Sequence, residues 1–404
     1  MAIGLNELPT LYPIAGVRLA VAEAGVRYQG RKDVVLIACD EGTMCAGVYT
    51  KNAFCAAPVQ IAKKNMGKAQ TRALLINSGN ANAGTGESGM QAAMDCCTST
   101  ADALGCESAQ VLPFSTGVIG ELLPAAKVQA VIPTLVSQLH EDQWASAAQA
   151  IMTTDTVAKG ASVKIMLSGQ QVTLTGIAKG SGMIRPDMAT MLAFVATDVD
   201  MDQGLLQECL VQSVETSFNR ITVDGDTSTN DACMLLATGR SGVVVDRQSA
   251  DLAVFVEALT NLCQQLAQSV IRDAEGVSKF ISVQVEGGAN PQECLQVAYT
   301  IAHSPLVKTA FFASDPNWGR ILAAVGRSGL PDLNVDTIAI YLDDVCIVDK
   351  GGRATSYTEE QGQSVMAKEE ITIRVILGRG QSVETVWTTD LSYDYVKINA
   401  EYRT

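Results

Sequence analysis

The chain has 404 residues, which is enough for two or three domains. Hydrophobic residues make up 47% of it and charged residues 18%, an ordinary composition for a globular protein. Asp and Glu outnumber Lys and Arg by 43 to 29, the net charge is −14, and no basic run exceeds two residues. Such a chain repels phosphate backbones and anionic lipid surfaces, so we expect neither nucleic acid nor membrane as a partner.

The beginning of the chain has no basic leader and no apolar core of a signal peptide, and no stretch is long enough to span a bilayer. Its 11 cysteines are scattered without a C-x-x-C pair, and there are only 2 histidines. This pattern predicts a cytoplasmic protein with reduced thiols, no bound metal, and a catalytic base other than histidine.

Short runs rich in Val, Ile and Thr, bounded by Gly, Asp and Asn, predict β-strands throughout the chain. The expected strands are 34–38, 73–77, 163–167, 171–175, 191–197, 233–238, 242–245, 280–287, 337–342, 371–377 and 383–389. Apolar residues at helical intervals predict helices between them. The expected helices are 88–105 with Ser88 as N-cap, 124–139, 142–151, 250–273 and 289–302.

Strands and helices are mixed rather than strictly alternating, and 163–176 and 371–389 have the pattern of hairpins. We therefore predict a layered α/β (α+β) fold with mixed sheets, not a doubly wound Rossmann fold. The Gly-rich stretch 176–187 is expected to separate two sets of strands.

The junction Ala189-Thr190 places a hydroxyl residue at the start of an apolar strand, behind that Gly-rich stretch. A threonine held there could attack the preceding carbonyl, after which water would release a new N-terminal amine. That amine could then serve as the base for the hydroxyl nucleophile. The alternative is an ordinary threonine at the beginning of a buried strand.

Three other segments combine Gly with short polar side chains. In 111–124, Ser115-Thr116-Gly117 forms either an oxyanion-binding turn or a plain turn between strand and helix. Segment 74–89 is either a binding loop or a structural cluster of Asx turns. In 150–159, Thr153, Thr154 and Asp155 contribute either to a site or to helix capping.

Two segments near the end of the chain are also unusual. Trp318 in 314–321 belongs either to a folded-over turn or to a pocket wall. The terminus 391–404 is rich in Tyr and Asn, so it is either a docked structural tail or a segment that supplies Asn399 and Thr404 to a cleft.

Taken together, these motifs resemble the glutamate N-acetyltransferase (ornithine acetyltransferase) family of arginine biosynthesis. The resemblance extends from about residue 13 to the last residue and rests on eight motifs in family order. They are INSGNANAGTG, PFSTGVIG, MTTDT, KGSGMIRPDMATML, VDGDTSTND, DAEGVSKF, DPNWGRI and DYVKINAEYRT.

The resemblance implies a precursor that cuts itself between Ala189 and Thr190 into an α chain, 1–189, and a β chain, 190–404. The chains would stay together, usually as an α2β2 heterotetramer, in a fold that resembles N-terminal-nucleophile hydrolases in layering only. Carried over by motif, Thr190 is the nucleophile, and Thr116 and Gly117 form the oxyanion hole. The substrate-binding residues implied in the same way are Thr153, Lys179, Thr190, Glu275, Asn399 and Thr404.

The implied reaction is a ping-pong acetyl transfer from N-acetylornithine to glutamate through an acetyl-threonine, with no cofactor and with acetyl-CoA as a possible co-substrate. By charge, Lys179 suits a carboxylate and Glu275 an ammonium group. Two alternatives stay open: a self-processing aminopeptidase or amidohydrolase that uses water, and a non-catalytic binding or scaffold protein descended from the enzyme.

Overall fold

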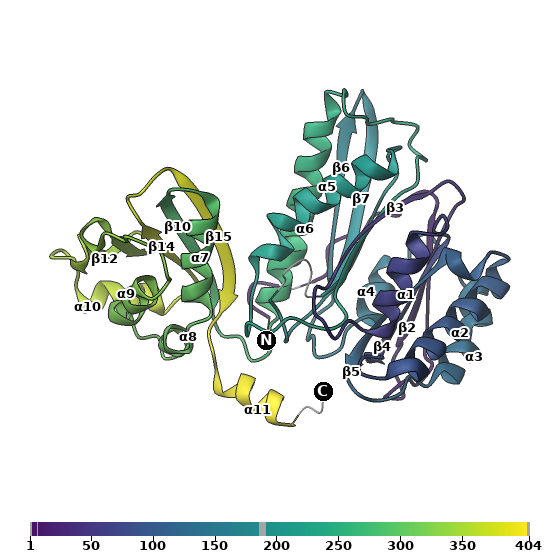
Figure 1. The fold of residues 1–404 in the computed structure, drawn as a ribbon, viewed down its shortest axis with the longest axis horizontal. Helices are drawn as coiled ribbons and strands as arrows, with labels where there is room; N and C mark the ends of the chain where they lie inside the picture. The colour runs from purple at the N-terminus through teal and green to yellow at the C-terminus, as the bar shows by residue number, and fades with distance from the viewer. Residues whose placement is uncertain (1, 6, 186–190, 402–404) are drawn as a thin grey trace. The chain divides into compact units, whose positions relative to one another are not determined.

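The computed structural model describes residues 2–5, 7–185 and 191–401. They form two compact units (Figure 1). The large unit holds residues 7–185, 191–219 and 227–270, and the small unit holds 2–5, 220–226 and 271–401. The predicted division into 1–189 and 190–404 concerns where the chain is cut, and it stays a prediction.

The first sheet of the large unit has the strand order β1-β2-β4-β5, with β4 and β5 parallel. Its strands are β1 (Val17–Ala22), β2 (Val34–Cys39), β4 (Ala73–Asn80) and β5 (Val111–Val118). One face is covered by α1 (Ala57–Met66), α2 (Gly86–Leu104) and α3 (Ala125–Ser137). Small side chains such as Ala93, Cys97 and Ala101 let α2 approach this sheet closely.

The second sheet of the large unit has the order β3-β9-β8-β7-β6. Its strands are β3 (Met44–Tyr49), β6 (Lys159–Leu167), β7 (Gln170–Lys179), β8 (Leu192–Thr197) and β9 (Ala232–Ala237). Helix α5 (Gln203–Glu215) packs on β3 and β9, and α6 (Asp251–Arg272) packs against Gly176 of β7.

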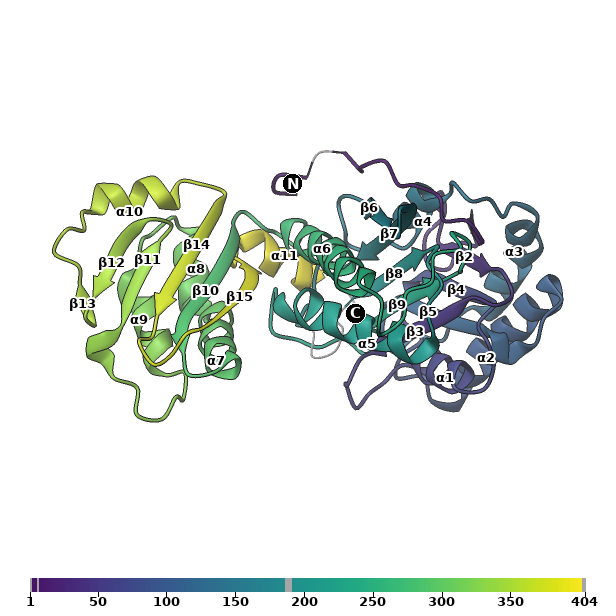
Figure 2. The ribbon, with the colours of Figure 1, turned by 90° about the horizontal axis from the view of Figure 1, so that it is seen from above.

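The inner faces of the two sheets share one apolar core, to which α4 (Trp144–Ala150) also contributes. Phe114 of the first sheet meets Phe194 of the second edge-to-face, with ring centroids 5.2 Å apart. The large unit therefore has four layers, helix–sheet–sheet–helix, which follow one another from α6 to α2 and α3 in Figure 2. The predicted layered α/β class with mixed sheets is confirmed.

The second sheet interleaves strands from both sides of the predicted cut. Strands β8 and β9, which follow it in sequence, lie between β3 and β7, which precede it. The expectation that 176–187 separates two sets of strands is therefore wrong, because β7 and β8 are antiparallel neighbours in one sheet.

The small unit is a single sheet with helices packed on its buried face. The strand order is β13-β12-β11-β14-β10-β15, and alternating burial along β14 shows that only one face is covered. The strands are β10 (Phe280–Gly288), β11 (Ala339–Leu342), β12 (Val345–Asp349), β13 (Gly352–Arg353), β14 (Glu370–Ile376) and β15 (Ser382–Thr389). The helices are α7 (Pro291–Ala302), α8 (Pro305–Phe312), α9 (Trp318–Gly326), α10 (Glu359–Met366) and α11 (Tyr393–Glu401).

Three expectations about local structure fail. The hairpin 163–176 is confirmed as β6 and β7, but 371–389 is not a hairpin, because β10 lies between β14 and β15. Helix α2 begins at Gly86 with Thr85 as N-cap, so Ser88 is already inside its first turn. Segment 242–245 forms only an isolated bridge at Val244, paired with Asp200.

All 11 cysteine thiols are free, and 8 of them are buried. In the part of the chain that the structure describes, no helix is long and apolar enough to cross a membrane.

Candidate functional site

The predicted oxyanion residues lie at the end of β5, beside the end of β4. Gly117 has φ +135°, and a Cβ there would lie 2.3 Å from the Gly79 carbonyl carbon and 2.5 Å from the Asn80 nitrogen. Only glycine fits so close an approach of two strands. The register also shifts here, because Asn80 pairs with both Thr116 and Val118. The bulge sets the direction of the backbone at Thr116 and Gly117.

A buried polar network fixes this bulge. The Ser115 hydroxyl donates to Asn77 Oδ1 (2.6 Å), and Asn77 Nδ2 donates to the Asn80 carbonyl (2.9 Å). From the loop before β9, Asn230 Nδ2 donates to the carbonyls of Ala81 (2.6 Å) and Ser115 (2.9 Å). These residues are 5% exposed or less, so water cannot reach their polar groups. The hydrogen bonds within the network satisfy these groups in its place.

The asparagine side chains at the end of β4 and just after it form hydrogen bonds within the fold. Asn82 is fully buried, its Nδ2 donates to the Gly89 carbonyl (2.9 Å), and its Oδ1 accepts from the Thr85 hydroxyl (2.8 Å). Asn80 Oδ1 in turn accepts from the Asn82 amide (2.8 Å). Of the two readings of 74–89, the structural cluster of Asx turns is the one that these bonds support.

Thr153 and Lys179 are linked through one buried carboxylate. Asp155 accepts from the Thr153 amide (3.0 Å) and from the amide of Gly180, the residue after Lys179 (2.8 Å). It also accepts from Lys159 Nζ at 2.6 Å, and both side chains of this ion pair are fully buried. Burial by itself would raise the pKa of Asp155, but Lys159 and Lys179 outweigh it and the pKa is lowered.

A second buried carboxyl, that of Asp231, lies near Lys179. The register places Lys179, Leu192 and Ala232 side by side across β7, β8 and β9. Asp231 directly precedes Ala232, and its Oδ2 has no hydrogen-bond partner. Burial raises the pKa of Asp231 well above its usual range, an effect that Ser228 and the Lys179 charge only partly offset. The neutral carboxylic acid is therefore favoured.

In the small unit, α11 brings Asn399 to Glu275. Asn399 Nδ2 donates to Glu275 Oε2 at 2.9 Å. The helix is held close because the Ser392 hydroxyl donates to the Gly276 carbonyl (2.6 Å), and a Cβ on Gly276 would lie 2.3 Å from the Tyr395 nitrogen. The terminal segment up to residue 401 is thus docked on the turn that carries Glu275.

A buried lysine anchors the strand that leads into α11. Lys308 Nζ donates to the Thr388 hydroxyl (3.1 Å) and to the carbonyl of Thr389, at the end of β15. Burial lowers the pKa of Lys308 to about 8, although Asp390 and Asp224 act in the opposite direction.

We expect Lys308 to titrate near pH 8, whereas exposed lysines titrate near pH 10.4. Between these values the unfolded chain binds more protons than the folded protein, so the free energy of unfolding should rise with pH from this group. NMR of ¹³Cε-labelled lysine measures the titration, and Lys308→Met assigns the resonance. A midpoint above pH 10 would contradict the expectation.

The structure describes six of the predicted site residues. Thr116 and Gly117 lie at the bulge, Thr153 and Lys179 meet through Asp155, and Glu275 contacts Asn399. Ala189, Thr190 and Thr404 lie outside the described residues. Trp318 follows the N-cap Asn317 of α9 and packs on the core of the small unit, which supports the turn reading over the pocket wall.

Sequence reasoning missed Asn230 and Asp231 as site components. Both stand in the motif VDGDTSTND, so the only available signal was a cluster of polar residues directly before an apolar strand. No group of three or more His, Cys, Asp or Glu residues among those described has the arrangement of a metal site.

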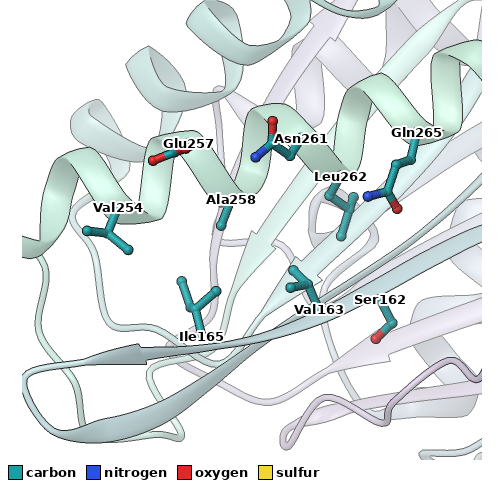
Figure 3. A pocket seen from close by; sticks show the side chains of 9 residues that line it. All are labelled: Ser162, Val163, Ile165, Val254, Glu257, Ala258, Asn261, Leu262 and Gln265. Carbon is teal, nitrogen blue, oxygen red and sulfur yellow. The ribbon is translucent and has the colours of Figure 1, made fainter.

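A pocket of about 300 Å³ lies elsewhere in the large unit, between β6 and α6. Figure 3 shows Val163 and Ile165 of the strand facing Ala258 and Leu262 of the helix. None of the predicted site residues lines it.

Comparison with known proteins places these features in a family. The ArgJ family matches residues 18–404. "Arginine biosynthesis bifunctional protein ArgJ" of Pseudomonas fluorescens is 55% identical over 406 aligned positions, covering 100% of both chains. The protein of the same name from Methylococcus capsulatus is 55% identical over 395 positions, covering 98% of this chain and 97% of that one.

A solved structure agrees with the sequence relationship. The crystal structure of the Bacillus halodurans arginine biosynthesis bifunctional protein ArgJ is 42% identical, with a TM-score of 0.51, and covers 53% of this chain and 100% of that chain. With the layered α/β fold, these relationships define an enzyme of amino-acid biosynthesis. The chain belongs to the ArgJ family.

Proposed function

We propose that this protein transfers the acetyl group of N-acetylornithine to glutamate in arginine biosynthesis, in the cytoplasm, after cutting itself between Ala189 and Thr190. The observation that carries the proposal is the 55% identity to bifunctional ArgJ proteins along the whole chain. The word bifunctional in those names supports a second activity, the acetylation of glutamate from acetyl-CoA as co-substrate.

The proposed mechanism has two half-reactions at one nucleophile. The Thr190 hydroxyl, with its own α-amine as base, attacks the acetyl carbonyl of N-acetylornithine, and Thr116 and Gly117 stabilise the tetrahedral oxyanion. The proton taken by the amine passes to the leaving nitrogen, ornithine departs, and an acetyl ester remains on Thr190. The amine of glutamate then attacks this ester, giving N-acetylglutamate and free enzyme.

Charge supports the proposed roles of the binding residues. Lys179 would pair with a substrate carboxylate and Glu275 with the ornithine ammonium group, each through charge-assisted hydrogen bonds. Thr153, Asn399 and Thr404 would add polar contacts. Two copies of each chain would form an α2β2 heterotetramer. No cofactor is needed for this chemistry.

Self-cleavage should give two chains that stay together. We expect intact-mass analysis to find fragments 1–189 and 190–404, and both should elute in one peak, because β8 and β9 are hydrogen-bonded between β3 and β7. They should separate only in denaturant. Thr190→Ala should remain a single chain. An uncut wild-type protein would contradict the assignment of Thr190.

The acceptor distinguishes acetyl transfer from hydrolysis. Ornithine release from N-acetylornithine should depend on glutamate, and N-acetylglutamate should form in equal amount. If ornithine were released at the same rate without glutamate, the protein would be an amidohydrolase that uses water.

A further inference from the structure

The Asp155–Lys159 ion pair is buried where no solvent reaches either charge. Both side chains have 0% exposure, and their closest atoms are 2.6 Å apart. A buried ion pair generally stabilises a fold no better than apolar side chains of the same size. Its position, rather than its contribution to stability, therefore calls for an explanation.

The carboxylate joins two segments that are distant in sequence. Besides Lys159, it holds the amide of Thr153, in the loop after α4, and the amide of Gly180, at the end of β7. The second amide belongs to the peptide bond that directly follows Lys179. Asp155 thus fixes the backbone at Thr153 and Lys179, the two described residues of the large unit that the proposed function assigns to substrate binding.

The two substrates share one negatively charged group at the same place. N-acetylornithine and glutamate differ in their side chains, but each has an α-carboxylate on the carbon that bears the reacting nitrogen. In a ping-pong reaction, donor and acceptor occupy the same position in turn. A single carboxylate-binding element next to the nucleophile can therefore serve both half-reactions.

We propose that the Asp155–Lys159 pair positions Thr153 and the Lys179–Gly180 peptide to recognise the α-carboxylate common to donor and acceptor. Asp155 is a positioning residue, which acts through Lys179 and Thr153 and does not touch the substrate. The inference rests on the proposed function and deepens it, because it names the group that defines the substrate class: N-acyl-α-amino acids and α-amino acids.

The test is the double variant Asp155→Asn/Lys159→Met. It removes one charge of each sign, so the net charge of the site is unchanged, while the Asn oxygen can accept from only one of the two amides. KM for N-acetylornithine and KM for glutamate should each rise about 10- to 100-fold, as small misplacements of binding groups do. The kcat per acetyl-enzyme, counted from the burst of ornithine, should change much less.

A substrate without the α-carboxylate separates positioning from general damage. N-acetylputrescine is the decarboxylated analogue of N-acetylornithine. Wild type and variant should have the same kcat/KM for it, so the preference for N-acetylornithine should fall about 10- to 100-fold. Asp198→Asn is the matched control, because Asp198 accepts the Thr173 amide (2.9 Å) at the opposite end of the same sheet. Its KM values should stay near those of wild type.

Each outcome has one meaning. Suppose that wild type releases ornithine only with glutamate. If the variant's kcat/KM then falls as much for N-acetylputrescine as for N-acetylornithine, or if only its number of active sites counted from the burst falls, the positioning role is wrong and the proposed function stands. If wild type shows no glutamate-dependent release, the proposed function fails and the inference with it. Where the double variant gives no folded, cut protein, Asp155→Asn alone is measured in the same way, and unchanged KM values overturn the proposal.

Discussion

Gly117→Ala should reduce acetyl transfer by about 10²-fold or more, or prevent folding of the large unit altogether. A Cβ at this position would lie 2.3 Å from the Gly79 carbonyl carbon and 2.5 Å from the Asn80 nitrogen. Both atoms belong to the backbone of the neighbouring strand, so no side-chain rotation relieves the overlap. The strands must move apart, and the backbone of the proposed oxyanion hole moves with them.

The control, Gly120, lies just after β5. Gly120 also has positive φ (+82°), but a Cβ there would have no atom within 4 Å. Gly120→Ala should lower the free energy of unfolding only by the strain of a left-handed backbone, about 1–2 kcal/mol. Its kcat should equal that of wild type. The measurements are kcat per acetyl-enzyme and near-UV circular dichroism. A folded Gly117→Ala protein with the kcat of wild type would disprove the tight approach of the strands.

The sequence predicted the fold class well and the pairing of strands less well. Local patterns identify β14 and β15 as strands. Two consecutive strands form a hairpin only if no other strand inserts between them. Here β10 pairs parallel with β14, whose partner residues lie ninety positions later in the chain, and antiparallel with β15. This long-range pairing is favoured because it buries apolar side chains such as Val283 and Val285. The local sequence of β14 and β15 therefore does not predict it.

The same limit applies to the candidate site. Motifs pointed to Thr116, Gly117 and Lys179 as candidates because the residues that define each motif are close in sequence. Asn230 was not found, because its partners Ala81 and Ser115 are 149 and 115 residues away. Which polar residues hold a site in place depends on contacts between distant parts of the chain. Only the three-dimensional structure distinguishes these residues from ordinary polar residues of a loop.

Asn230→Ala should reduce both stability and activity. It leaves the buried carbonyls of Ala81 and Ser115 without their donor, and unsatisfied groups cost about 1–3 kcal/mol each. The free energy of unfolding of the large unit should therefore fall by about 2–6 kcal/mol. Because Ser115 directly precedes Thr116, freeing its carbonyl loosens the proposed oxyanion hole, and kcat should fall about 10- to 100-fold.

Asn65→Ala separates these two effects. Asn65 Nδ2 also donates to two carbonyls, those of Val111 (2.9 Å) and Ser108 (3.3 Å), but at the beginning of β5 instead of its end. Urea unfolding should give a comparable loss of stability for both variants, while kcat at 25 °C should fall only for Asn230→Ala. Equal kcat values in the two folded variants would mean that the network stabilises the fold without shaping the site. A selective loss would mean that Asn230, which follows the proposed cleavage site in sequence, holds the β4–β5 bulge from the β9 side in the geometry that the proposed oxyanion hole needs.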